Sequence, residues 1–164
     1  MSGGERSAKY ADDFVSAQRR FIELVESLND EQWRAPGRNF PERINDVDES
    51  RSVGVIAHHV ASSEQFIIDR IYLMLEGKPM PPVDFTESNA KHAAQKSAVT
   101  RDEVVALLRA NEGRIAPRVR AIPDNQLDVE RQTPAGPATV AQRLERVLVG
   151  HLTMHQGSIE AALR

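Results

Sequence analysis

The 164-residue sequence contains no cysteine. This absence excludes disulfide bonds, thiolate-ligated zinc and a cysteine nucleophile, so any thiol chemistry would need a thiol supplied by a small molecule. Apolar runs are also short, far below the roughly 18 consecutive apolar residues that a membrane-spanning helix needs. No apolar signal core follows Met1, and we therefore expect a cytoplasmic protein that does not enter a membrane.

A large excess of charge of either sign is missing as well. The net charge is −3, and Arg and Lys are interleaved with Asp and Glu rather than gathered in one block. A nucleic-acid-binding domain usually carries a clear basic patch, so we expect no nucleic-acid partner. Hydrophobic residues make up 40% of the chain, which is enough for the core of one globular domain.

Apolar residues recur at helical spacing in four long segments, and no segment reads convincingly as a strand, with at most a few extended residues over 129–135. We therefore predict an all-α protein: a four-helix bundle that forms one domain over residues 8–164, after a flexible tail at 1–7. The predicted helices cover residues 8–28, 52–76, 100–122 and 139–163. The connections after the first two helices are long, so the helices need not alternate in direction along the chain.

Local signals refine this prediction. Thr100 and Glu103 have the spacing of a capping box at the start of the third helix. Pro117 predicts a kink or break in that helix, because proline lacks the amide hydrogen that an interior position needs. The segment 78–99 is expected to be an irregular connection with a short helical turn around 89–97. Connections of this length often cover an active site.

His151 and His155 lie four residues apart in the last predicted helix, so both imidazoles leave the same side of it. That side also carries the apolar stripe, and the two rings are therefore expected to point into the protein. Buried imidazoles are costly unless something satisfies their nitrogens. Hydrogen bonds to a neighbouring helix would do so, and so would a metal ion held between helices.

The second predicted helix offers the third histidine that a metal site would need. With about 100° per residue and the apolar stripe centred on Val60, His59 lies about 100° away, on the flank of the helix. His58 lies about 160° away and should face solvent. We therefore predict His59, His151 and His155 as metal ligands, with His58 as the alternative ligand on this helix.

Two further residues have alternative interpretations. Glu64 would either hold a histidine in the tautomer that leaves its other nitrogen to the metal, or form a charge at the surface or between helices. His92 lies in the predicted connection 78–99, where a solvent-exposed histidine is expected and contact with the substrate is the alternative.

Three segments stand out together by their order and spacing: LNDEQW at 28–33, SVGVIAHHV at 52–60 and HLTMHQGSI at 151–159. They resemble the DinB/YfiT-like superfamily of metal-binding four-helix bundles. Its Ser-Val-Gly-x-x-x-x-His-hydrophobic pattern places a ligand on His59, in agreement with the position of this residue on its helix. The chain departs from the family at Ser158, where Gln or Glu is common, and at Val55, where a polar residue is common.

The resemblance implies a divalent metal, commonly zinc or nickel, held by three histidines, and a homodimer. It also implies a thiol-dependent S-transferase or isomerase that activates a low-molecular-weight thiol, such as mycothiol or bacillithiol, for attack on a small-molecule substrate. A thiol that coordinates a metal loses its proton, which would generate the nucleophile. The alternatives are a metal-dependent hydrolase and a non-enzymatic metal-binding or stress-response protein.

Overall fold

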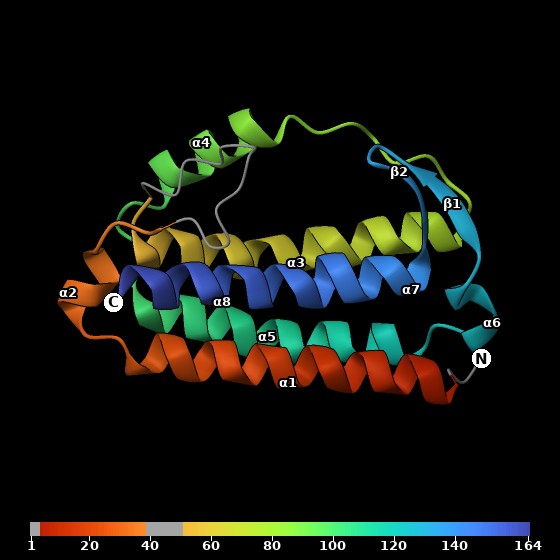
Figure 1. Cartoon of the computed structure of the whole chain (residues 1–164), viewed down its shortest axis with the longest axis horizontal. Helices are drawn as coiled ribbons and strands as arrows, with labels where there is room; N and C mark the ends of the chain where they lie inside the picture. The colour runs from red at the N-terminus through yellow and green to blue at the C-terminus, as the bar shows by residue number, and fades with distance from the viewer. Residues whose placement is uncertain (1–3, 39–50) are drawn as a thin grey trace.

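The computed structural model describes residues 4–38 and 51–164, and four long helical segments lie side by side in it (Figure 1). These segments are α1 (Glu5–Ser27), α3 (Val53–Leu75), α5 (Arg101–Arg120) and a last one made of α7 (Val140–Arg143), a π-helical turn η1 (Leu144–Val149) and α8 (Gly150–Ala162). Three short helices connect them: α2 (Asp30–Arg34), α4 (Phe85–Gln95) and α6 (Asp124–Leu127). The predicted four-helix bundle is confirmed, and none of the described helices is long and apolar enough to span a membrane.

The long helices do not alternate in direction along the chain. α1 and α8 run one way through the bundle, and α3 and α5 run the other way (Figure 1). α1 packs against α5 and α8, and α3 packs against the same two helices. The parallel pair α3 and α5 requires the chain to return along the bundle between them, and the segment that contains α4 makes this return.

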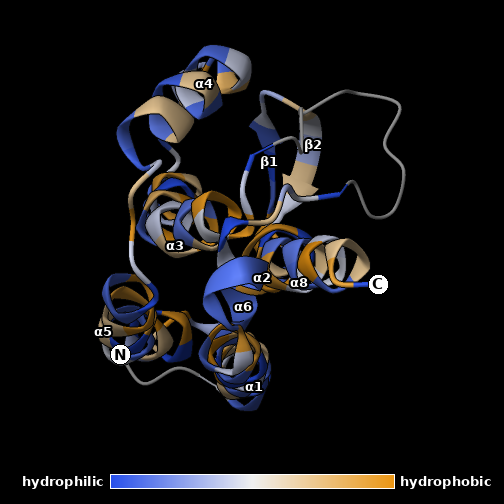
Figure 2. Ribbon diagram, turned by 90° about the vertical axis from the view of Figure 1, so that its left-hand side faces the viewer, coloured by the Kyte–Doolittle hydropathy of each residue, from blue (hydrophilic) through white to orange (hydrophobic). Residues whose placement is uncertain are grey.

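The apolar sides of the four helical segments meet in a single core (Figure 2). Phe14 and Phe21 of α1, Ile68 of α3, and Leu108 and Ile115 of α5 are fully buried there. Burial of such side chains stabilises the fold by about 1.5–3 kcal/mol each. The core therefore fixes the mutual positions of the helices that carry the candidate site.

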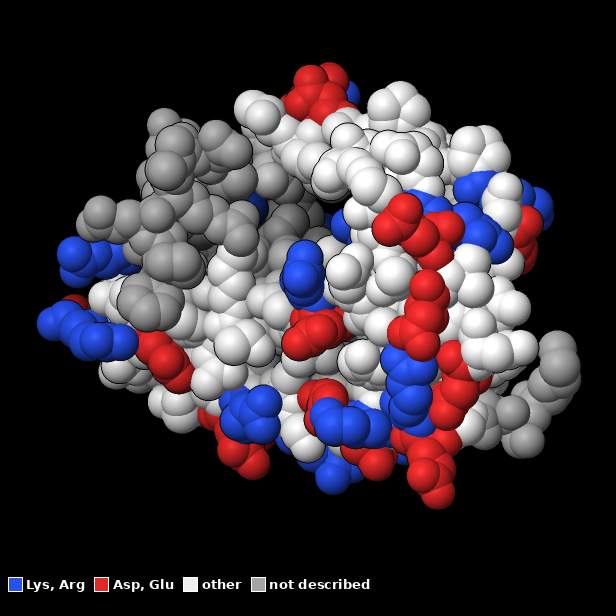
Figure 3. Space-filling model, turned by 45° about the vertical axis from the view of Figure 1, so that its right-hand side comes forward, with Lys and Arg blue, Asp and Glu red and all other residues white. Residues whose placement is uncertain are grey.

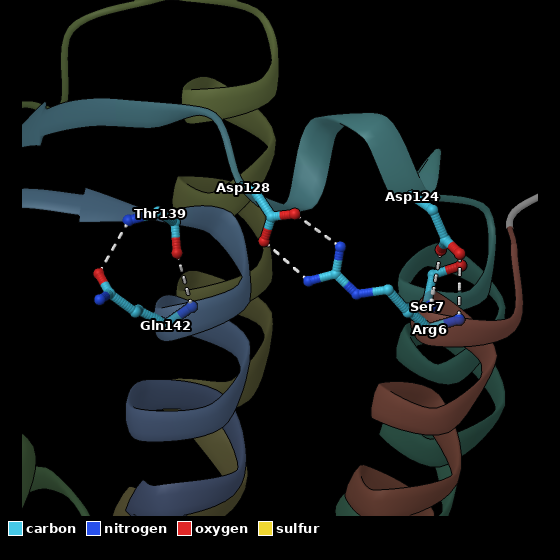
Figure 4. A network of polar contacts seen from close by, with 6 residues as sticks. All are labelled: Arg6, Ser7, Asp124, Asp128, Thr139 and Gln142. Atoms are coloured by element: carbon cyan, nitrogen blue, oxygen red, sulfur yellow. Dashed lines mark hydrogen bonds and ion pairs between the residues drawn. The ribbon is translucent and has the colours of Figure 1, made fainter.

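α1 begins at Glu5, three residues earlier than the sequence predicts, so residues 5–7 are helical rather than part of a flexible tail. Figure 4 shows why this end is ordered. The carboxylate of Asp124 accepts hydrogen bonds from the backbone amides of Arg6 and Ser7 at 3.1 and 3.0 Å. The guanidinium of Arg6 donates to both carboxylate oxygens of Asp128 at 2.7 Å. Residues 1–3 lie outside the described part of the chain.

Two other expectations need correction. Pro117 does not break the third helix, because α5 continues to Arg120 with Ala116 and Val119 buried on either side of the proline. Tertiary packing of this kind outweighs local helix propensity. A small antiparallel hairpin also forms, β1 (Glu130–Thr133) with β2 (Gly136–Thr139), where the sequence predicts at most a few extended residues over 129–135.

The π-helical turn η1 is a further feature that the sequence does not predict. The buried residues Leu144, Leu148 and Leu152 follow one another at intervals of four. Steps of four drift by about 40° each around an α-helix of 3.6 residues per turn. The wider π turn absorbs this drift. The buried side of the last helical segment therefore continues from α7 into α8.

Candidate metal centre

His59 of α3 meets His151 and His155 of α8 where the two helices pack together. Potential ligand nitrogens of the three rings all lie within 4.8 Å of one another, and Nε2 of His59 is 3.1 Å from Nε2 of His151. Imidazole nitrogens bound about 2.05 Å from a tetrahedral ion would lie about 3.3 Å apart. The donor set fits a divalent ion. The structure thus brings together the histidines that the sequence predicts as ligands, and their ligand role remains a prediction.

The surroundings of His59 keep its ring neutral. Burial, together with the nearby His151 and Arg51, lowers the pKa of His59 to about 2. His155 is only 4% exposed. Because a metal ion binds the neutral imidazole, a histidine with a lowered pKa is available as a ligand at pH 7 without first losing a proton.

The end of α3 that carries His59 is anchored by its neighbours. The side chain of Ser52 caps the helix by accepting a hydrogen bond from the amide of Val55. A Cβ atom on Gly54 would lie 2.6 Å from the ring of Trp33, so only glycine lets this ring pack against the helix. The Trp33 indole also donates to the carbonyl of Val99 at 2.9 Å. These contacts join α2, α3 and the residues just before α5 near the histidines.

A cavity of about 530 Å³ lies beside the three histidines. α3 and α8 contribute two of its walls, and α4 and the hairpin, which lie on the same side of the bundle, contribute the others (Figure 2). Its apolar lining comprises Phe66, Ile67, Val83, Phe85, Val147 and Met154. This volume is typical of a site for a small molecule. As the sequence predicts, the 78–99 segment covers part of the site.

His58 and His92 lie against each other rather than facing solvent. Nδ1 of His58 is 2.7 Å from Nε2 of His92, and the two rings stack with centroids 5.0 Å apart. The reason is that α4 is a true helix: the Asp84 side chain caps it by accepting from the Glu87 amide, and this places His92 over α3. His58 is not one of the three clustered histidines, so the geometry does not favour it as a ligand.

Glu64 does not hold a histidine tautomer and does not lie at the surface: it is 1% exposed and lies between helices in the core, where it contacts side-chain amides. Its Oε2 atom accepts hydrogen bonds from Gln18 Nε2 at 3.0 Å and from Asn111 Nδ2 at 2.8 Å. Burial raises the pKa of Glu64 to about 8. Its position about 140° around the helix from His59 already pointed away from the histidine side.

Sequence reasoning also missed Arg70 and Arg143, which line the cavity. The guanidinium of Arg70 donates to the carbonyl of Pro81 at 2.9 Å and lies 5.1 Å from the centroid of the Phe66 ring. Neither arginine belongs to a recognisable motif. Arg143 precedes the π-helical turn, whose effect on helix register the sequence does not reveal.

A solved structure described as "YfiT from Bacillus subtilis is a probable metal-dependent hydrolase with an unusual four-helix bundle topology" is similar, with a TM-score of 0.75 and 22% sequence identity, over 99% of this chain and 88% of that chain. At this identity the likeness shows the fold. Comparison with curated proteins found no match. The model of the DinB superfamily matches residues 13–159, which include all three clustered histidines, and the chain therefore belongs to the DinB superfamily.

Proposed function

We propose that this protein is a divalent-metal-dependent enzyme in which His59, His151 and His155 hold the ion and the adjacent cavity binds a small-molecule substrate. The observation that carries the proposal is the convergence of three imidazoles at the wall of a 530 Å³ cavity. Structural zinc sites are usually closed by four protein ligands, whereas catalytic sites keep a position open. The cluster found among the described residues has three members, which supports an open site.

Within this class we infer a thiol-dependent transferase or isomerase. When bound, the ion would supply Lewis acidity and an open position at which a thiol is held as thiolate. None of the described lining residues of the cavity is Asp or Glu, so the reaction would proceed without a carboxylate base from these residues. Glu64 is buried in the core and does not line the cavity. Since the chain has no cysteine, the thiol would come from a low-molecular-weight cosubstrate.

Metal-dependent hydrolysis is the second candidate function. It is favoured by the likeness to YfiT, which is described as a probable hydrolase of this kind. The same three histidines would hold the ion, and water would replace the thiol as nucleophile. The two functions differ in one requirement, since hydrolysis proceeds without any thiol.

Metal binding is tested by elemental analysis and titration with zinc and nickel on tag-free protein. We expect about one ion per chain in the wild type and a loss of binding in His155→Ala. His58→Gln is the matched control, because it changes the neighbour of His59 in sequence without removing a member of the cluster. Equal metal content in the wild type and His155→Ala would contradict the proposed site.

Activity is tested with metal-loaded protein and 1-chloro-2,4-dinitrobenzene as a model electrophile, in the presence of mycothiol, bacillithiol or cysteine. Turnover that needs both the thiol and His155 would support the transferase. Hydrolysis of 4-nitrophenyl acetate without any thiol would favour the hydrolase. No turnover in either assay would favour a non-enzymatic metal-binding protein. The homodimer expected from the family remains a prediction, which analytical ultracentrifugation tests.

A further inference from the structure

The charged residues that line the cavity are all basic. They are Arg51, Arg70 and Arg143, and no Asp or Glu occurs among the lining residues that the structure describes. Figure 3 shows the molecule hollowed below its upper rim, with Lys or Arg atoms visible inside the hollow. A concave wall with charge of one sign focuses the electrostatic field and attracts ligands of the opposite sign.

Arg70 and Arg143 lack the carboxylate partner that a partly buried arginine normally has. Within residues 4–38 and 51–164, Arg143 forms no hydrogen bond or ion pair, and its Nε atom is buried. Arg70 is only 7% exposed, and a single backbone carbonyl accepts from its guanidinium. Burial lowers the pKa of both arginines, and the charge of Arg70 adds to this effect on Arg143. A partly buried cation without an anion is costly, and a bound anion would remove this cost.

The two arginines and the three histidines lie at different levels along the bundle. Arg70 follows His59 by eleven residues on α3, which corresponds to about 16 Å along the helix axis. Arg143 precedes His151 by eight residues, or about 10 Å, because the π-helical turn between them rises less per residue than an α-helix. Phe66 and Val147 line the wall between these levels. The cavity therefore has a histidine end, an apolar middle and an arginine end.

We infer that the substrate of this cavity is an apolar molecule that carries an oxyanion, a carboxylate, sulfonate or phosphate, and that Arg70 and Arg143 bind this group. The inference rests on the proposed function, because it names the substrate class of the same cavity. The anion lies at the arginine end and the apolar body lies against Phe66 and Val147. The reacting part of the molecule then reaches the histidine end, so the arginines fix both orientation and specificity.

Anion binding is tested on metal-free protein, so that the result does not depend on the metal proposal. Isothermal titration calorimetry compares 4-phenylbutyrate with its neutral amide, 4-phenylbutanamide, and with the corresponding sulfonate and phosphonate. The variants are Arg143→Gln, which removes the charge, and Arg143→Lys, which keeps it. Arg109→Gln is the matched control, because Arg109 forms an exposed ion pair with Glu26 away from the cavity. Circular dichroism confirms that each variant is folded.

We expect the wild type to bind at least one of the three anions more tightly than the amide. Arg143→Gln should weaken anion binding about 10- to 100-fold, because it removes a charge-assisted hydrogen bond to the ligand. Arg143→Lys should recover part of the loss, and Arg109→Gln should bind like the wild type. The tightest binder among the three anions identifies the oxyanion. Equal affinity for amide and anions, or unchanged affinity in Arg143→Gln, would overturn the inference, whereas loss of metal binding alone would leave it standing.

Discussion

The arginines between α1 and α5 and those of the cavity have opposite surroundings. Arg19 pairs with Glu112 and Arg109 with Glu26 at 2.9 and 2.5 Å, and each pair joins α1 to α5 across the surface. Figure 3 shows basic and acidic side chains interleaved over the lower part of the molecule. In the cavity, Arg70 and Arg143 have no carboxylate among the described lining residues. The arginines of the α1–α5 side are thus paired with carboxylates of the same chain, whereas those of the cavity side remain available to an anionic ligand.

The same contrast holds for neutral polar groups. Gln18 of α1 and Asn111 of α5 both donate to Oε2 of Glu64 inside the core, although Oε1 of Glu64 and Oε1 of Gln18 have no partner among the described residues. The three histidines instead turn their nitrogens toward one another beside a cavity. Polar groups that satisfy one another support stability, whereas groups arranged around an open space are available for function.

The largest expected effect concerns packing on the α1–α5 side. Leu108 is fully buried on α5, and Leu108→Ala should lower the free energy of unfolding by about 2–5 kcal/mol, because it removes buried methyl groups and leaves a cavity. Phe66 lines the cavity and is 40% exposed, so Phe66→Ala should lower the free energy of unfolding by less than about 1 kcal/mol. Urea unfolding measures both. Equal losses in the two variants would contradict the division into a stabilising and a binding side.

The second prediction concerns the buried carboxyl group. The pKa of Glu64 is raised from 4.5 to about 8 in the folded protein, so the folded state holds its proton more tightly than the unfolded state does. Stability should therefore fall as the pH rises from about 4.5 to about 8. Glu64→Gln keeps an oxygen that can accept from Gln18 and Asn111, and it should remove this dependence.

The expected gain for Glu64→Gln is at most about 3 kcal/mol at pH 7, from about 1.4 kcal/mol for each pH unit above the unfolded pKa. Urea unfolding at several pH values between 4 and 9 measures it, with the wild type as reference. A parallel pH profile for the two proteins would show that Glu64 is ionised in the folded state at neutral pH.

The third prediction separates stability from binding at the cavity. Arg143→Gln removes one of two cations that repel each other, so the ligand-free variant should be more stable than the wild type by about 0.5–1 kcal/mol. Thermal unfolding in buffers without carboxylate, phosphate or sulfate measures this gain. A clear loss of stability would mean that Arg143 stabilises the fold, which would contradict its proposed role as a binding residue without a partner in the protein.

The smallest effect is expected for the exposed ion pairs. Arg109→Gln should lower stability by less than about 1 kcal/mol at low salt, because exposed pairs contribute little. The difference should shrink further at 1 M NaCl, where charges are screened within about 3 Å. A large and salt-independent loss would show that the α1–α5 pairs do more than neutralise surface charge.

The sequence was sufficient for the four long helices and for the meeting of His59 with His151 and His155, because both follow from helical periodicity. The rotation of His59 to the flank of α3 depends only on its distance from Val60 along the helix. The cap at Thr100 was also correct, since the side-chain chemistry of a cap is local.

The features that the sequence did not reveal depend on tertiary contacts. His92 was assigned to an irregular connection because 85–95 has no long apolar stripe, although Asp84 and Glu87 have the spacing of a helix start. The pairing of His92 with His58 follows only when α4 folds back over α3. Arg70 and Arg143 look like ordinary surface arginines until the cavity between α3 and α8 is known.

The π-helical turn has a consequence for tracing this site through other sequences. Thr139 and His151 are twelve positions apart, and the turn between them accommodates one residue more than a regular α-helix would over the same rise. A chain one residue shorter in 144–149, with an unbroken α-helix, would present the same two imidazoles to α3. Alignments that demand a fixed distance from cap to histidine would miss such proteins, whereas the four-residue step from His151 to His155 tolerates no gap.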